Sequence, residues 1–397
     1  MTGILRPLMF LLVLIFGTAC LDGAGALAPC DPRGLDSEIC GWTNPEDMSF
    51  LPDRSWIIVS EMAPNQLGVA EQDRRIEPGR LTALRLGDLA RRVLYPPTSS
   101  TLPRSTTSAI GGAPEGVMEE PTLGEGTPTN RRWGDEQCAG EPDRAVFQPH
   151  GIDVGWGPDR VPALAVVNHG GREAIEFFEI IPGHFPSLVW RGCVLMPPGM
   201  SHNDVALLPG GGFVVTNFMR SFEKIGPRAL WTMLKIGLGM RTGSVLQWQP
   251  GTVIREIENS QGSAPNGIAV SPDGHEIWVA EWGGKSIYRL RLSDSAPPLR
   301  DEIQLDQNPD NFSWMRDGRL LVAGQHGGLL ASLGCASIKE TGCDIGYSVY
   351  AIDSSSTELE ATKLFEGRGA ASVALEVGDE IFVGFFIGDQ IERLSGK

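Results

Sequence analysis

The stretch NGIAVSPDGHEIWVA, residues 266–280, carries the pattern that decides the fold. After the polar Asn266, small and large side chains alternate up to residue 270. A turn follows at Pro272-Asp273-Gly274, and a second, mainly apolar segment occupies residues 276–280. Alternation with a period of two on both sides of a Pro/Asp/Gly turn is typical of a β-hairpin. We therefore expect two antiparallel strands here, joined by a tight turn.

The same pattern recurs five more times along the chain. The other copies begin at Glu46, His150, Asn203, Asp310 and Ser372. The last five copies start 44 to 63 residues apart, which is the size of a four-stranded propeller blade. The sequence thus predicts an all-β fold in which residues 41–397 form one six-bladed β-propeller. A β-sandwich with coincidental turns is the alternative.

Two insertions interrupt the repeats. Residues 96–143 are rich in Pro, Ser, Thr and Gly and contain few large apolar residues, so we expect a poorly ordered, low-complexity insertion. Residues 229–238 are apolar, compatible with a helix and flanked by basic residues. This short helix is predicted to form a lid or to lean on a membrane. A helix packed against the tops of the blades is the alternative.

The composition narrows the classes of function. The chain has 397 residues, 41% of them hydrophobic, and a net charge of −16. This apolar content excludes a disordered chain, and the acidic charge argues against a nucleic-acid partner. The sequence contains no GxSxG serine-hydrolase motif, no GxxxxGK[ST] phosphate loop and no HExxH zinc motif.

Residues 1–20 resemble an export signal. Arg6 precedes an apolar segment at residues 8–16, and Gly17-Thr18-Ala19 lies directly before Cys20. This order is similar to a bacterial lipoprotein signal, in which the cysteine is lipidated. We expect an exported protein of the cell envelope that is anchored in a membrane through Cys20, with residues 21–40 as a linker. Cleavage after residues 26–28 without lipidation is the alternative.

The number of cysteines agrees with export. If Cys20 carries a lipid, six cysteines remain, which suits an oxidising compartment. Six cysteines allow 15 pairings. Position favours Cys335 with Cys343, because both lie in one glycine-containing loop. The other expected pairs are Cys30–Cys40 and Cys138–Cys193.

The residues that open the innermost strands of a propeller meet near its axis. Here these residues carry mostly carboxylate and amide oxygens, which are costly to bury without a partner. A hard cation such as calcium, which takes six to eight oxygen ligands, would satisfy them. A water-filled channel lined by polar caps is the alternative. The residues are Glu46, His150, Asn203, Asn266, Asp310 with Asn311, and Ser372.

At these positions the chain resembles the paraoxonases, which are calcium-dependent arylesterases and lactonases built on a six-bladed propeller. The resemblance begins at about Glu46 and covers most of the chain. Bacterial propellers of the gluconolactonase and senescence-marker group share the architecture with fewer of the motifs. The motifs are Pro149-His150-Gly151-Ile152, Val166-Val167-Asn168-His169, Asn203-Asp204, Asn266-Gly267-Ile268 with Ser271-Pro272-Asp273-Gly274, and Asp310-Asn311.

The resemblance implies two calcium ions. A catalytic ion would be held by Glu46, Asn203, Asn266, Asp310 and Asn311. A deeper structural ion would be held by Asp47, Asp204 and the backbone carbonyl of Ile152. Neighbouring residues on a strand point to opposite sides, so each of the doublets Glu46-Asp47 and Asn203-Asp204 suits two stacked sites.

The resemblance also implies a catalytic histidine pair, His150 and His169. A histidine near neutral pKa accepts a proton from water, and a cation polarises a carbonyl. We therefore expect hydrolysis of esters or lactones. Each histidine could instead be structural.

The substrate wall is kept only in part. His326 matches a histidine of the family's active site, but Phe218 stands where the family has an acidic residue. Trp231 lies in the predicted lid. Two other functions stay open: a non-catalytic, calcium-stabilised binding or scaffold module of the envelope, and a sugar-acid lactonase of the gluconolactonase type.

Overall fold

The computed structural model describes residues 24–34, 37–63, 77–97, 133–220, 227–293, 296–335, 337–339, 341–356 and 358–395. The predicted export signal, Cys20 and residues 98–132 of the predicted insertion lie outside this part of the chain. Within it, no helix combines the length and apolar character that crossing a bilayer requires.

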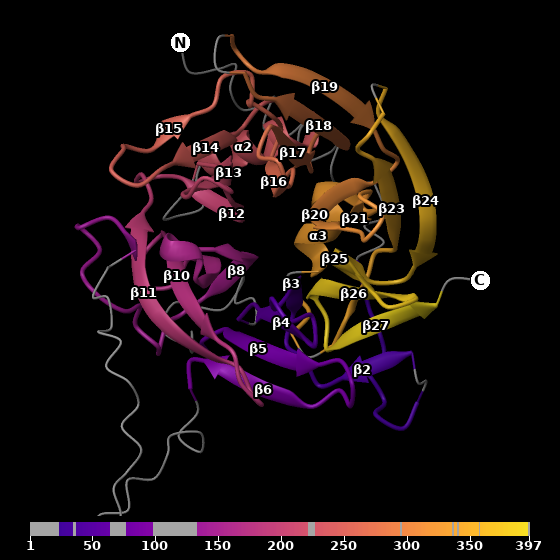
Figure 1. Ribbon diagram of the computed structural model, residues 1–397. Coiled ribbons are helices and arrows are strands. Elements are labelled where there is room, and N and C mark those ends of the chain that lie inside the picture. The colour runs from indigo at the N-terminus through magenta and orange to yellow at the C-terminus, as the bar shows by residue number, and fades with distance from the viewer. Residues whose placement is uncertain are drawn as a thin grey trace, which may run out of the picture.

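Six sheets stand side by side in a ring around a common axis (Figure 1). Each of the six predicted hairpins forms the two innermost strands of one sheet, so the predicted six-bladed propeller is confirmed. The innermost strand of every sheet contacts the innermost strands of both neighbouring sheets. The residues that open these strands are therefore brought to a common axis.

The first three blades are built from 13 strands. The first comprises β3 (Pro45–Phe50), β4 (Trp56–Glu61), β5 (Arg80–Arg85) and β6 (Arg91–Tyr95). The second comprises β7 (Trp133–Gly134), β8 (Pro149–Trp156), β9 (Pro162–Asn168), β10 (Ala174–Ile181) and β11 (Ser187–Leu195). The third comprises β12 (Ser201–Leu207), β13 (Phe213–Met219), β14 (Ser244–Trp248) and β15 (Arg255–Glu256).

The next two blades have four strands each. The fourth comprises β16 (Pro265–Val270), β17 (Glu276–Glu281), β18 (Ser286–Arg291) and β19 (Leu299–Gln304). The fifth comprises β20 (Asn308–Trp314), β21 (Leu320–Gln325), β23 (Tyr347–Asp353) and β24 (Glu360–Gly367). Two helices, α2 (Pro227–Gly237) and α3 (Gly328–Cys335), follow β13 and β21 and contact each other. The predicted helix over residues 229–238 is thereby confirmed.

Both ends of the described chain build the sixth blade. Its strands are β25 (Ala370–Val377), β26 (Glu380–Ile387), β27 (Gln390–Ser395) and β2 (Glu38–Cys40). Because β2 pairs with β27, the ring is closed by hydrogen bonds between segments from opposite ends of the chain. The propeller thus includes residues that the sequence assigned to a linker. A three-residue strand is too short to show a period.

A second short pairing joins the N-terminal segment to the fifth blade's long connection. Here β1 (Gly25–Ala26) lies antiparallel to β22 (Cys343–Asp344). The three expected disulfides are all present, at Cys30–Cys40, Cys138–Cys193 and Cys335–Cys343. They hold the segments before β2, after β7 and after α3, where the chain has little regular structure of its own.

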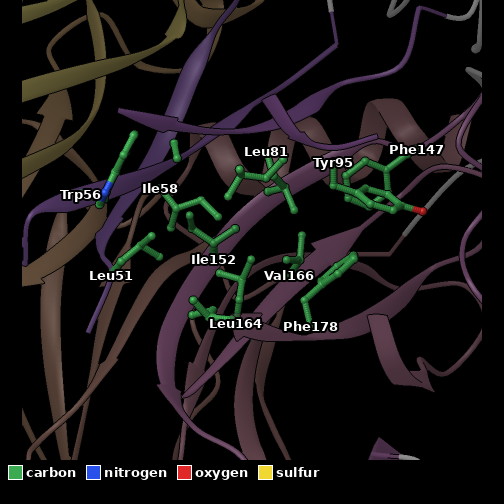
Figure 2. Close-up of a cluster of buried hydrophobic side chains, with 13 residues drawn as sticks. Leu51, Trp56, Ile58, Leu81, Tyr95, Phe147, Ile152, Leu164, Val166 and Phe178 are labelled. Atoms are coloured by element: carbon green, nitrogen blue, oxygen red, sulfur yellow. The ribbon is translucent and has the colours of Figure 1, made fainter. Parts of the chain in front are cut away.

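The apolar core lies between the blades. Ile58 and Leu81 of the first blade pack against Ile152, Val166 and Phe178 of the second (Figure 2). Equivalent apolar clusters separate the other neighbouring blades. Fully burying one such side chain stabilises a protein by about 1.5–3 kcal/mol. Burial of these faces therefore holds the blades together, and it leaves the channel free for polar groups.

Candidate functional site

All six innermost strands have a register shift at the same point. The shift falls within the first five residues of each strand and corresponds to a β-bulge, which redirects side chains. Four of these strands carry a proline at this point, where the ladder hydrogen bond is already interrupted. The shifts lie at Pro45/Asp47, Pro149/Ile152, His202/Val205, Pro265/Ile268, Pro309/Phe312 and Ala371/Val373.

The bulges let neighbouring strands approach closely on the axis. At Gly151, an added Cβ would lie 2.5 Å from the Cα of Asp204 in the next blade. At Gly267, it would lie 2.2 Å from the backbone oxygen of Asp310. A side chain has no room at either position, which explains the His-Gly and Asn-Gly pairs.

The five residues predicted to hold the catalytic calcium lie together on the axis and are buried. Four of them present an oxygen without a hydrogen-bond partner in the described residues: Glu46 Oε2, Asn203 Oδ1, Asn266 Oδ1 and Asn311 Oδ1. The fifth, Asp310, accepts a hydrogen bond from Gln325 Nε2 at 2.6 Å.

These oxygens fit a divalent cation. Buried acceptors without a donor cost free energy, and calcium is bound by carboxylate and amide oxygens. The two carboxylates of Glu46 and Asp310 carry the two negative charges that one such ion would neutralise, and the three amides add ligands without charge.

A second acidic layer lies on the other side of the bulges. Asp47 Oδ2 accepts a hydrogen bond from the backbone N–H of Ile152 at 2.7 Å, and Asp204 Oδ2 accepts one from Ile268 at 2.8 Å. Each carboxylate therefore links its own blade to the next. Carboxylate oxygens have lone pairs left for a cation, so these residues also suit the predicted structural ion.

The sequence analysis missed a third acid in this layer, Asp153. Its Oδ2 accepts a hydrogen bond from the backbone N–H of Leu207 at 2.7 Å. Asp153 occupies the residue after Ile152 in the second copy of the repeat. It lies two residues further from the start of its copy than Asp47 and Asp204 do, so the doublet pattern does not include it.

The two layers face different cavities. One cavity, of about 270 Å³, is lined by Glu46, His150, Asn203, Asn266 and Asp310. The other, of about 1140 Å³, is lined by Asp47, Asp153, Asp204 and Ile152, and the two have no lining residue in common. Adjacent residues on one strand thus serve opposite sides, as the doublets predict.

Burial strongly raises the pKa values of the acids in both layers. It raises the pKa of Asp47 to about 8 and the pKa of Asp310 to about 7. Burial and the charge of Asp47 raise the pKa of Glu46 and of Asp204 well above their ordinary values. Desolvation disfavours a charged carboxylate, and like charges nearby add to the effect. The channel thus favours any ligand that supplies positive charge.

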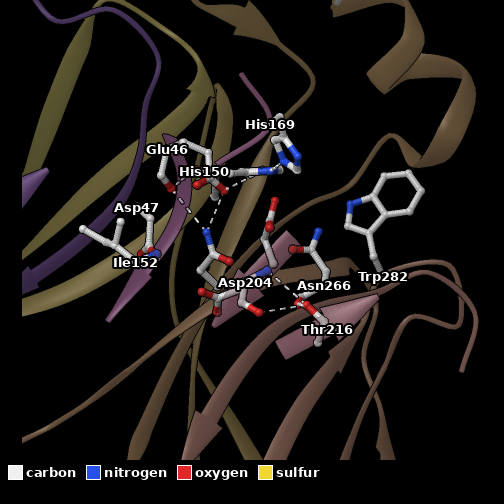
Figure 3. A network of polar contacts seen from close by, with 12 residues as sticks. Glu46, Asp47, His150, Ile152, His169, Asp204, Thr216, Asn266 and Trp282 are labelled. Carbon is white, nitrogen blue, oxygen red and sulfur yellow. Dashed lines mark hydrogen bonds and ion pairs between the residues drawn. The ribbon is translucent and has the colours of Figure 1, made fainter. Parts of the chain in front are cut away.

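The two predicted catalytic histidines are in contact. His150 Nδ1 lies 3.0 Å from His169 Nε2, and His150 Nε2 lies 3.6 Å from Glu46 Oε1 (Figure 3). Burial and the neighbouring His169 lower the pKa of His150 to about 3. His150 is therefore neutral near pH 7, with one nitrogen toward His169 and the other toward the acidic oxygens.

Glu173, which sequence reasoning missed, holds two histidines. Its Oε2 lies 2.8 Å from His169 Nδ1, and its Oε1 lies 2.8 Å from both the backbone nitrogen and Nδ1 of His202. Burial alone would raise the pKa of Glu173, but the hydrogen bonds from His169 and His202 hold it well below its usual range. Its place four residues after His169 is the one signal in the sequence.

Of the three residues expected to form the substrate wall, one lines the small cavity and two do not. Phe218 lines the 270 Å³ cavity together with Met62, Trp282 and Phe386. His326 and Trp231 do not line it. His326 Nε2 lies 2.7 Å from Ser348 Oγ, and Trp231 is 55% exposed on α2.

Known proteins resemble parts of this sequence. The family described as Arylesterase matches residues 125–339, more than half of the chain. Serum paraoxonase/lactonase 3 from Homo sapiens is 26% identical over 160 residues, which are 40% of this chain and 43% of that protein. The match thus spans less than half the length of this curated relative.

Among solved structures, a luciferin-regenerating enzyme superposes with a TM-score of 0.50 at 12% identity, covering 90% of this chain and 93% of that one. A gluconolactonase from Xanthomonas campestris has a TM-score of 0.48 at 16% identity, covering 94% of this chain and 98% of that one. At such identities, the likeness to the luciferin-regenerating enzyme concerns the fold alone.

In protein stripped of divalent cations, we expect the melting temperature to fall by several degrees as the pH rises from about 5 to about 8. The raised pKa values mean that the folded state binds more protons than the unfolded state in this window, so the stabilisation is lost as these acids ionise. Added calcium should abolish the fall, because the cation replaces the protons. Melting curves with EDTA and with calcium measure this. A melting temperature that rises with pH in EDTA would contradict it.

Proposed function

Because the chain belongs to the arylesterase family, we propose that it is a calcium-dependent hydrolase of esters or lactones. The observation that carries the proposal is the contact between His150 and Glu46 in the small cavity. There His150, in contact with His169, faces Glu46, whose other carboxylate oxygen is one of the unpartnered oxygens of the cation site. A polarised carbonyl and a proton acceptor at one place are what hydrolysis by activated water requires.

Hydrogen bonds set the direction in which His150 accepts a proton. The Glu173 carboxylate accepts the Nδ1 proton of His169, so His169 Nε2 is an acceptor. His169 Nε2 accepts a hydrogen bond from His150 Nδ1–H, so the lone pair of His150 is on Nε2, the nitrogen that faces Glu46. In this proposal His150 is the general base and His169 is the residue that orients it.

The cation would be held by Glu46, Asn203, Asn266, Asp310 and Asn311. When bound, it would polarise the substrate carbonyl and acidify a neighbouring water. The acidified water matters because a base with a pKa of about 3 is weak toward ordinary water. Apolar side chains of the cavity, among them Phe218 and Trp282, keep bulk water away from the reacting groups.

Export and anchoring belong to the same proposal. Three disulfides within the described residues suit an oxidising compartment. We propose that the protein acts in the cell envelope and is tethered through a lipid on Cys20. The natural substrate would then be a small ester or lactone that reaches the envelope.

Hydrolysis of phenyl acetate and of a medium-chain γ-lactone tests the proposal. We expect the purified mature protein to hydrolyse at least one of them, to lose this activity in EDTA and to regain it with calcium. A melting curve recorded alongside distinguishes a hydrolase from a binding module that only holds calcium. A melting point raised by calcium with no turnover on either compound would instead support a binding module.

The substitution His150→Gln tests the general base. We expect kcat to fall by about 100-fold or more, the usual scale for such a group, with little change in melting temperature. His275→Gln is the matched control, because His275 is exposed in the turn before β17. Near-wild-type kinetics of His150→Gln would remove His150 from this role.

Exposed apolar residues on α2 support a lid or a membrane-leaning helix. Leu230 is 70% exposed, Trp231 55% and Leu234 40%, and a row of this kind is typical of surfaces that bind apolar partners. We expect the double change of Trp231 and Leu234 to Ser to weaken binding to phosphatidylglycerol vesicles or turnover of long-chain esters several-fold. The matched control changes Trp156 and Leu299, which are exposed elsewhere, to Ser. If both variants behave like the wild type, the helix is a structural element.

A further inference from the structure

A third histidine, His202, lines the small cavity without a role in the proposed hydrolysis. It belongs to β12 and directly precedes Asn203, one of the cation-site residues. Its side chain is fully buried, and a buried imidazole ordinarily has both nitrogens hydrogen-bonded. Here one nitrogen is bound and the other is not.

Glu173 determines that the Nδ1 of His202 carries a proton. His202 Nδ1 and the backbone nitrogen of His202 both lie 2.8 Å from Glu173 Oε1. An ionised carboxylate only accepts hydrogen bonds, so Nδ1 carries the proton. In the neutral ring, Nε2 therefore presents a lone pair, and it has no partner in the described residues.

This lone pair is poorly suited to the cation. Calcium prefers oxygen ligands, and the residues of the cation site already supply such oxygens, including the side chain of Asn203. A nitrogen acceptor left over in the same cavity is thus available to a donor on the substrate. The donors that a small ester or lactone ordinarily carries are hydroxyl groups.

A second unpartnered group lines the same cavity. Ser332 Oγ of α3 is buried and has no hydrogen-bond partner among the described residues. A hydroxyl group both donates and accepts, so it would donate to His202 Nε2 and accept from Ser332 Oγ. Apolar side chains, among them Met62, Phe218 and Phe386, line other parts of the cavity.

We propose that His202 and Ser332 form a hydroxyl-binding subsite, so that the preferred substrate is a small ester or lactone with a free hydroxyl group near the reacting carbonyl. The inference rests on the proposed hydrolase function for its substrate class. The volume of about 270 Å³ lies just below the usual range of ligand pockets and suits a compact molecule. A site built to bind a hydroxyl discriminates strongly against an analogue without it.

The test compares hydroxyl compounds with their methyl ethers, which lack the donor. Turnover is measured on α-hydroxy-γ-butyrolactone and α-methoxy-γ-butyrolactone, with calcium present. Binding is measured by calorimetry with 2-hydroxycyclopentanone and 2-methoxycyclopentanone, which cannot be hydrolysed. The wild type should favour the hydroxyl compound in each pair by about 10-fold, the scale of leaving a buried acceptor unpaired.

Two variants test whether His202 and Ser332 cause the preference for the hydroxyl compound. His202→Leu and Ser332→Ala should each reduce the 10-fold ratio to about 3-fold or less, whereas the control His275→Leu should keep it. Ser332→Ala carries the test alone if His202→Leu does not fold. A wild type without the preference, or variants that retain it, would overturn the subsite. So would an equal loss on both members of each pair in His202→Leu, because His202 would then act only by holding Glu173.

The binding measurement separates the two proposals. If the wild type hydrolyses no ester or lactone but binds 2-hydroxycyclopentanone better than its ether, and the variants lose this difference, the subsite stands and the hydrolase function fails. If hydrolysis depends on calcium and neither pair shows a preference, the function stands and the subsite is wrong.

Discussion

Burial of acidic and amide oxygens on the propeller axis is the constraint on which the rest of the site depends. The six hydrophobic interfaces between blades force the innermost strands together, and the strand openings cannot move away from one another. Burial disfavours the charged form of these acids, and the charge of Asp47 adds to the effect, so that the pKa values of Glu46 and Asp204 are raised well above their ordinary values. A positive ligand relieves the repulsion. Its affinity is therefore supplied in large part by the packing of the whole ring.

The repeated β-bulge converts this constraint into two separate sites. In a regular strand, Glu46 and Asp47 would already point to opposite sides. The bulge also frees backbone N–H groups. That of Ile152, for example, donates a hydrogen bond to Asp47 of the second acidic layer. Asp47 and Asp204 thus have two tasks, since they link neighbouring blades and they face the larger cavity. In the layer of Glu46, by contrast, four side chains each keep one oxygen without a partner in the described residues.

The hairpins and the strand openings were predictable because their signals are local. Each hairpin is specified by alternation within about ten residues, and each opening residue is tied to its strand. The acid Glu173 was not predictable from the same signals, because its role comes from contacts with His169 and with His202 of the next blade. The closing strand β2 was missed for a related reason. Its pairing with β27 joins opposite ends of the chain, and three residues carry no pattern.

Glu173 determines which nitrogens of His169 and His150 carry protons. A dyad of His150 and His169 alone leaves the direction of its proton undefined, because either nitrogen of each ring can carry it. A carboxylate at one end removes this freedom, since it accepts from His169 and so sets the acceptor nitrogen of both rings in turn. The same carboxylate sets His202. One partly exposed residue on the loop between β9 and β10 therefore orients both the proposed base, His150, and the acceptor left in the cavity wall, His202.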